Sequence, residues 1–235
     1  MKVVALIPYW DEYRFPEQSV SNRDTIKIGG HSLIERTVML LQDIDQVDDI
    51  VIYSSNEQVQ ELFDDSLKYS FLKRDESLDH ENISIEDIIE NFLKETEADV
   101  VLLVHPKCPF LRPDSVQDCI NKVARGSFDS AFFCSKHKKL AWFNGKPLNH
   151  SLISKGHTPS LSTLEPVIFE SSSVYVFTRK LFESTRRRIG SNPYMKFLGH
   201  FEGFEIDRID DYEIAELIIN AGLDVTESLN GNGKH

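Results

Sequence analysis

One stretch of the chain is the most informative about its fold: Val100-Val101-Leu102-Leu103-Val104-His105-Pro106-Lys107-Cys108-Pro109-Phe110-Leu111-Arg112. Its apolar beginning belongs to a predicted strand, Ala98–Val104, of the kind that is buried on both faces of a sheet. Pro109 and Pro113 mark the step from this strand into a helix predicted at about residues 114–125. A buried strand followed at once by a helix is the building unit of α/β folds.

The residues before this stretch show the same alternation. Two further strands are predicted, at Lys2–Ile7 and Asp49–Ser54. Helical spacing of apolar residues lies between the strands, at Ser32–Gln42, Asn56–Phe63 and from Ser84 to about Glu95. The last helix begins with a capping box of Ser84 and Asp87. Strands joined by single helices are expected to pair in parallel, with right-handed crossovers.

The pattern changes in the second half of the chain. Strands are predicted at Ser130–Cys134, Leu140–Phe143, Val174–Phe177 and Gly203–Asp207, with a tight turn at Asn144-Gly145. Helices are predicted at Arg179–Arg187 and at Asp210–Asn220, the second ended by Ala221-Gly222. The polar segment Asn149–Pro166 indicates a long loop or arm. We expect one domain, residues 1–229, with an inserted arm at about residues 137–168 and a disordered tail at residues 230–235.

The charge balance excludes several classes of protein. The 235 residues include 26 lysines and arginines against 38 aspartates and glutamates, a net charge of −12. A general nucleic-acid binder carries a basic excess that neutralises phosphates, and an anionic membrane surface attracts basic segments. We therefore expect no nucleic-acid partner and no membrane partner.

Neither the apolar runs nor the cysteines indicate export. A membrane-spanning helix needs about 20 apolar residues, and no strand-like segment here approaches that length. The apolar run Lys2–Ile7 is also too short for a signal peptide. The three cysteines, Cys108, Cys119 and Cys134, are odd in number and lack metal-ligand spacing, so a disulfide framework is not expected. These features predict an acidic, cytoplasmic globular protein.

The carboxyl ends of the predicted strands are the expected place for a ligand, as in other open α/β sheets. Four segments qualify, at residues 8–30, 54–56, 105–112 and 205–211. The first has no glycine beside Tyr9 or Trp10 that would let backbone amides approach a phosphate. The chain also lacks the Walker lysine motif, G-x-S-x-G and H-E-x-x-H.

Acidic residues crowd the last of these segments. Glu205 and Asp207 would point to the same face of a strand, so their carboxylates could converge on one hard cation such as Mg²⁺. Asp210 is better explained as the cap of the following helix, with Glu213 completing a capping box, while Asp211 favours the helix dipole. For Asp207, a metal ligand and a solvated carboxylate are both open.

The segment after the central strand carries the cations Lys107 and Arg112 beside His105. Such a loop could face phosphates or a carboxylate, although by composition alone its charges are more often those of a solvated surface. Cys108 has no histidine at a diagnostic spacing and is interpreted as a packing residue. Arg74 is ambiguous by itself.

Several short motifs, in order along the chain, resemble those of the cytidylyltransferases that activate acidic sugars, namely the acylneuraminate cytidylyltransferases and their CMP-nonulosonate and CMP-KDO synthetase relatives. They are Val4–Pro8, Ile28–Ile34, Ile52–Asn56, Arg74–Leu78, Glu81–Asp87, His105–Arg112, Glu165-Pro166 with Glu170–Phe177, Arg188–Pro193, and Glu205-Ile206-Asp207 with Asp211. The matches span nearly the whole chain. The resemblance implies an α/β, Rossmann-like nucleotide-diphospho-sugar transferase fold, a mixed and mostly parallel sheet flanked by helices.

The same resemblance implies an activity. A hydroxyl of an acidic sugar, a nonulosonic acid related to sialic acid, would attack the α-phosphorus of CTP and release pyrophosphate, with Mg²⁺ as cofactor. Two alternatives remain: a cytidylyltransferase with a non-sugar acidic acceptor, and a noncatalytic relative that binds a nucleotide or sugar. The arm lies where relatives have a dimerisation element, so a homodimer is expected.

The resemblance also assigns roles to residues. It gives Arg14 and Arg23 to the triphosphate, Arg74 to a nucleotide phosphate, and Lys107 to a phosphate or the acceptor carboxylate. Asp207, with Glu205 or Asp211, would hold Mg²⁺. Arg14, Lys107 and Asp207 would be catalytic, and the nucleotide-binding set also includes Pro8, Asn56 and His105. The first loop departs from the family's Arg-x-Gly-Ser-Lys pattern, and Asp11 and Glu12 add negative charge there.

Overall fold

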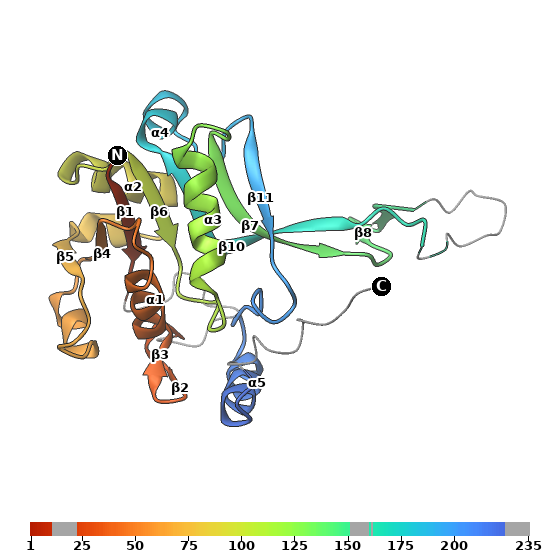
Figure 1. Cartoon of the computed structure of the whole chain (residues 1–235), viewed down its shortest axis with the longest axis horizontal. Coiled ribbons are helices and arrows are strands. Elements are labelled where there is room, and N and C mark those ends of the chain that lie inside the picture. The colour runs from red at the N-terminus through yellow and green to blue at the C-terminus, as the bar shows by residue number, and fades with distance from the viewer. Residues whose placement is uncertain (11–22, 151–159, 161, 224–235) are drawn as a thin grey trace.

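The computed structural model describes residues 1–10, 23–150, 160 and 162–223, and a seven-stranded sheet forms its centre (Figure 1). The strand order is β11-β7-β10-β6-β1-β4-β5. The strands are β1 (Val3–Pro8), β4 (Asp49–Ser54), β5 (Ser70–Lys73), β6 (Val100–Val104), β7 (Ser130–His137), β10 (Val167–Thr178) and β11 (Pro193–Phe197). Only β10 runs antiparallel to its neighbours, β6 and β7. The predicted mixed, mostly parallel sheet is confirmed.

Helices cover both faces of this sheet. They are α1 (Leu33–Gln42) and α3 (Pro113–Ala124) on one face and α2 (Ile85–Glu95) and α4 (Arg179–Thr185) on the other, while a fifth helix, α5 (Ile209–Asn220), packs in a separate cluster. Successive residues of a strand point to opposite faces, so Ala5 and Ile7 of β1 pack with α1 and α3, whereas Val4 and Leu6 pack with α2. None of the helices in the described part of the chain is long and apolar enough to cross a membrane.

A third apolar cluster lies apart from the two faces and attaches α5. Ile206, Tyr212 and Ala215 pack there against residues near the start of α1 and after β6, including Phe110. The backbone amide of Gly29 adds a hydrogen bond of 2.9 Å to the Glu216 side chain. The segment 205–211 is therefore held close to the loop that follows β6.

Most of the strongly patterned elements are confirmed. The strand at Asp49–Ser54 has the predicted bounds, and the strand after residue 98 begins at Val100. The capping box of Ser84 and Asp87 is formed in both directions. The tight turn at Asn144-Gly145 has φ values of 49° and 72°, and it joins the short strands β8 (Trp142–Phe143) and β9 (Lys146–Pro147).

Four elements differ from the sequence prediction. Residues 203–207 are not a strand, because their amides bond to turns and to Lys107 rather than to a strand ladder. The helix predicted at Asn56–Phe63 is a short 3₁₀ helix, η2 (Glu57–Leu62). The half-buried edge strands β5 and β11 were not predicted. Short remaining elements are η1 (Arg23–Thr25), β2 (Lys27–Ile28), β3 (His31–Ser32) and η3 (Glu76–Asp79).

The outer parts of β7 and β10 project from the body of the molecule together with β8 and β9 (Figure 1). We call residues 135–150 and 162–170 the arm. Pairing of β7 with β10 is interrupted between Glu170 and Tyr175, where the arm joins the central sheet. Residues 151–159 and 161 of the predicted arm, and the predicted tail at 230–235, lie outside the described residues.

Candidate active site

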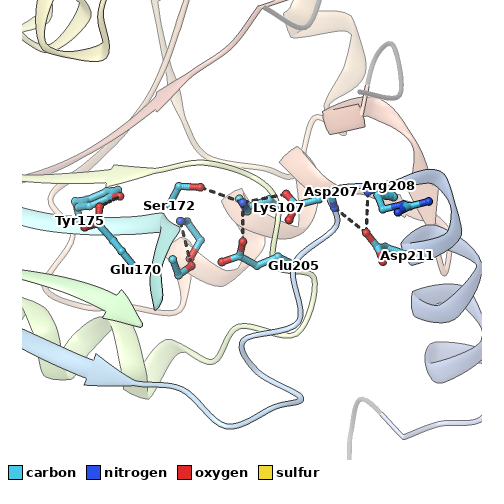
Figure 2. Close-up of polar contacts among 10 residues, drawn as sticks. Lys107, Glu170, Ser172, Tyr175, Glu205, Asp207, Arg208 and Asp211 are labelled. Carbon is cyan, nitrogen blue, oxygen red and sulfur yellow. Dashed lines mark hydrogen bonds and ion pairs between the residues drawn. The ribbon is translucent and has the colours of Figure 1, made fainter. Parts of the chain in front are cut away.

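The candidate site is built around the ammonium group of Lys107. Its Nζ lies 2.7 Å from Glu205 Oε2, 3.1 Å from Asp207 Oδ1 and 3.0 Å from Ser172 Oγ (Figure 2). Lys107 follows β6, Ser172 lies where the pairing of β10 is irregular, and the two carboxylates precede α5. Three segments far apart in the sequence therefore meet at one charged group.

Backbone hydrogen bonds fix the position of these segments. The amide of His105 donates to the carbonyl of Ser173, and the amide of Lys107 donates to the carbonyl of His105, both at 2.8 Å. The amide of Ile206 donates to the carbonyl of Lys107, also at 2.8 Å. Ile206, between Glu205 and Asp207, is fully buried, and the carboxylates of both neighbours contact the ammonium group of Lys107.

Lys107 is protonated in this setting. Its side chain is only 9% exposed, and burial, the largest single influence, lowers its pKa. Hydrogen bonds and charge from Glu205 and Asp207 act in the opposite direction, and together they raise the pKa above its ordinary value. Burial above all raises the pKa of the neighbouring Cys108 thiol to about 12, which disfavours the nucleophilic thiolate form. This agrees with its interpretation as a packing residue.

Asp211 does not join Glu205 and Asp207. Its carboxylate accepts hydrogen bonds from the amides of Asp207 (2.9 Å) and Arg208 (2.7 Å), so it caps α5 (Figure 2). The prediction that Asp210 caps this helix is wrong, because the helix begins at Ile209 and its third residue, Asp211, reaches the cap.

The carboxylates as arranged do not fit a protein-bound magnesium ion. The described residues contain no group of three His, Cys, Asp or Glu side chains placed to hold a metal. Glu205 and Asp207 converge as predicted, but they converge on the Lys107 ammonium. Asp211 is directed at backbone amides instead.

Arg74 lies inside the protein, although the family resemblance predicts that it contacts a nucleotide phosphate. Its side chain is 0% exposed and donates to the carbonyls of Tyr9 and Tyr53, each at 2.9 Å, and to Asp79 at 2.5 Å. The guanidinium also stacks over the Trp10 ring at 4.5 Å. Arg74 therefore fixes the carboxyl ends of β1 and β4, where the first loop begins.

The remaining predicted residues are dispersed along the same edge of the sheet. Pro8 ends β1 beside Tyr53 of β4, and the Asn56 side chain accepts from the amide of Gln58 at 2.9 Å, which caps η2. His105 immediately follows β6 and is half-buried. Arg14 and the side chain of Arg23 lie outside the described residues.

Ser172 is a member of the site that the sequence motifs do not single out. This residue belongs to the run Ser171-Ser172-Ser173, which is unusual inside an otherwise apolar strand. Its neighbours Ser171 and Ser173 bond to each other at 2.7 Å, and Ser172 is left to accept from Lys107. The feature of the sequence that could have indicated this role is the run of three serines within the strand.

Comparison with known proteins places this geometry in context. A family model described as cytidylyltransferase matches residues 20–216. A search of curated proteins gave no match. Among solved structures, CMP:2-keto-3-deoxy-manno-octonic acid synthetase complexed with CTP is 13% identical, with a TM-score of 0.67 over 94% of this chain and 100% of that one. The 4-diphosphocytidyl-2C-methyl-D-erythritol synthase of Anaerococcus prevotii is 14% identical, with a TM-score of 0.61 over 93% and 96%. At these identities the likeness shows the fold alone, and it confirms the predicted fold class.

Proposed function

The chain belongs to the cytidylyltransferase family, and from this premise we propose that it transfers CMP from CTP to an acidic sugar, a nonulosonic acid related to sialic acid. The observation that carries the proposal is the family match, which extends over residues 20–216 and so includes both sides of the Lys107 cluster. The CMP-sugar synthetase with its CTP has the same fold and is consistent with this reaction.

In the proposed reaction, a hydroxyl oxygen of the acceptor forms a bond to the α-phosphorus of CTP. The bond from that phosphorus to the oxygen bridging to the β-phosphorus breaks, and pyrophosphate leaves. The hydroxyl proton passes to water. Such transfers depend mainly on the position of the reactants and on neutralisation of phosphate charge.

We assign the phosphate contacts to Arg14 and Arg23. Lys107 is the fixed positive charge at the ends of the strands, and it holds Glu205 and Asp207 in place. Magnesium is proposed to arrive with CTP, as part of the substrate, because the protein carboxylates are already engaged. Since the reaction consumes CTP, we expect it in the cytoplasm.

The arm supports a proposed homodimer. Trp142, Phe143, Leu148 and Phe169 have between 53% and 66% of their surface exposed, and all lie on the projecting part of the molecule. Exposed aromatic side chains gathered on one projection are typical of a surface that binds another protein. A second copy of the chain is the proposed partner.

The first test is calorimetric titration of the protein with CTP, UTP, ATP and GTP, with and without Mg²⁺. We expect Mg²⁺-dependent binding that is selective for CTP. Pyrophosphate release with CTP and a panel of acidic sugars then tests turnover. Pyrophosphate release only with non-sugar acidic acceptors would show that the acceptor is not a sugar.

A noncatalytic role has one observation in its favour, namely the first loop, which lacks the family's Arg-x-Gly-Ser-Lys pattern and carries Asp11 and Glu12. Nucleotide binding without pyrophosphate release from any acceptor would favour that role. Absence of nucleotide binding by a folded sample would contradict the proposed reaction.

A further inference from the structure

We infer that Lys107 is a built-in cation, whose ammonium occupies the place between Glu205 and Asp207 that a protein-bound divalent metal would need. The protein by itself then binds no metal at these carboxylates. For its meaning in catalysis this inference rests on the proposed function, but its test uses the protein without nucleotide.

The hydrogen-bonding capacity of the lysine is fully used at this position. An ammonium has three N–H donors and no acceptor. Glu205 Oε2, Asp207 Oδ1 and Ser172 Oγ lie 2.7, 3.1 and 3.0 Å from Nζ, one acceptor for each donor. Figure 2 shows them arranged around the end of the side chain. A metal ion at this place would have to displace a buried ammonium from all three.

The distances from Nζ to these oxygens are those expected around an ammonium group. Mg²⁺ requires six oxygen ligands at about 2.0–2.1 Å. The contacts of 2.7 and 3.1 Å from Nζ to the carboxylates are those of charge-assisted hydrogen bonds. The backbone bond from Ile206 to the Lys107 carbonyl holds both carboxylates at this separation.

The charge on this cluster has a consequence for the nucleotide. One ammonium and two carboxylates leave the group of Lys107, Glu205 and Asp207 with a net negative charge. The side chain of Asp207 is 56% exposed, so this charge faces solvent at the edge where the proposed triphosphate would bind. Metal that accompanies the nucleotide would offset the repulsion.

The experiment measures Mn²⁺ binding to the full-length protein by electron paramagnetic resonance, without nucleotide, at constant ionic strength. The wild type is expected to show no binding that depends on Asp207. Lys107→Ala frees both carboxylates, and we expect its Mn²⁺ affinity to be about tenfold or more above that of the wild type. The double variant K107A/D207N should lose this gain.

Two further variants keep the result interpretable. Lys196 of β11 pairs with Asp118 at 2.9 Å, away from the site. The Lys196→Ala protein is the control and should show no gain in Mn²⁺ binding. Lys107→Gln removes the charge but keeps a polar side chain only one atom shorter, and it replaces Lys107→Ala if that variant fails to fold by circular dichroism.

Mn²⁺ bound by the wild type and lost in Asp207→Asn would overturn the inference. It would equally be overturned if neither folded Lys107 variant gains Mn²⁺ affinity, because the lysine would then be an ordinary ion pair. Neither outcome depends on whether CTP is the substrate, so failure here is distinct from failure of the proposed function.

Discussion

At the scale of single residues, the protein places charged groups inside and gives each of them several partners. Lys107 and Arg74 are both buried, and each joins segments that are distant in the sequence. A buried charge is costly unless it is fully hydrogen-bonded. Removal of either side chain would therefore leave its polar partners without a hydrogen bond. The two residues nevertheless have different roles, one at the proposed reaction site and one beneath the first loop.

Lys107→Met should lower pyrophosphate release by about 100-fold or more, mainly in kcat, because the fixed positive charge at the strand ends is lost. Lys107→Arg restores the charge and is expected to recover part of the rate. Lys196→Met, in which the lost partner is Asp118, is the matched control and should retain the wild-type rate. Equal rates for wild type and a folded Lys107→Met protein would remove Lys107 from the reaction.

Arg74→Met should lower the free energy of unfolding by about 3 kcal/mol, because Asp79 and two backbone carbonyls lose a buried partner. Urea unfolding followed by circular dichroism measures this loss. Arg186→Met is the control, because Arg186 is exposed and forms ion pairs with Asp87 and Glu90. It should lower the free energy of unfolding by less than about 1 kcal/mol. Similar losses for the two variants would contradict the structural role of Arg74.

Tyr53 gives the stability a defined dependence on alkaline pH. Burial, followed by the charge of Glu95, raises its pKa from 10.0 to about 12. Between these values the unfolded chain loses the phenolic proton while the folded protein retains it, so the contribution of Tyr53 to stability is present below pH 10 and falls as the pH rises toward 12. Urea midpoints of Tyr53→Phe and wild type, measured between pH 9 and 11, should therefore show a steeper decline for the wild type. Parallel declines would show that Tyr53 does not titrate in this way.

At the scale of elements, the sequence predicted best where a pattern is local and complete. Val100–Val104 is apolar throughout and is buried throughout, and Ser84 with Asp87 contains the whole capping box within four residues. The edge strands β5 and β11 have no strong sequence pattern. Each has only one neighbouring strand, and its residues are a mixture of half-buried and exposed. Their hydrogen-bonding partners, rather than their own composition, make them strands.

Several residues of the site could be predicted from the sequence, but not which of them contact one another. Glu205 and Asp207 were identified as converging carboxylates, although the strand proposed to align them does not exist. Both carboxylates contact Lys107, which precedes Asp207 by 100 residues in the sequence. No local sequence pattern indicates such a long-range contact. In the same way, Asp211 rather than Asp210 caps α5 because the helix begins one residue before the predicted start.

The turn that leads into β11 depends on the absence of a side chain at Gly190. A Cβ atom there would lie 2.4 Å from an Asp129 carboxylate oxygen, and that carboxylate accepts from the amide of Asn192 at 2.8 Å. Gly190→Ala should therefore destabilise the protein by about 1–3 kcal/mol in urea unfolding. Gly199→Ala is the matched control, since nothing lies within 4 Å of its Cβ position. A neutral Gly190→Ala would mean that Asp129 can move aside without cost.

At the scale of the whole molecule, the arm predicts the oligomeric state. Multi-angle light scattering at micromolar concentration should give twice the mass of one chain. Replacement of Trp142 and Phe143 by serine removes two exposed aromatic rings and should give the mass of a single chain. Leu217→Ser, at a comparably exposed position on α5, should leave the dimer intact. A monomeric wild type would contradict the proposed dimer.

The contacts of Lys107 also determine when the site can form during protein synthesis. A chain emerging from the ribosome makes β6 and α3 early, but Asp207 is synthesised 100 residues after Lys107. At about 5–20 residues per second, Asp207 is synthesised about 5–20 seconds after Lys107. The cluster is thus among the last parts of the protein to be completed, and a chain cut short before residue 205 would have the sheet strands but not the charge arrangement at their ends.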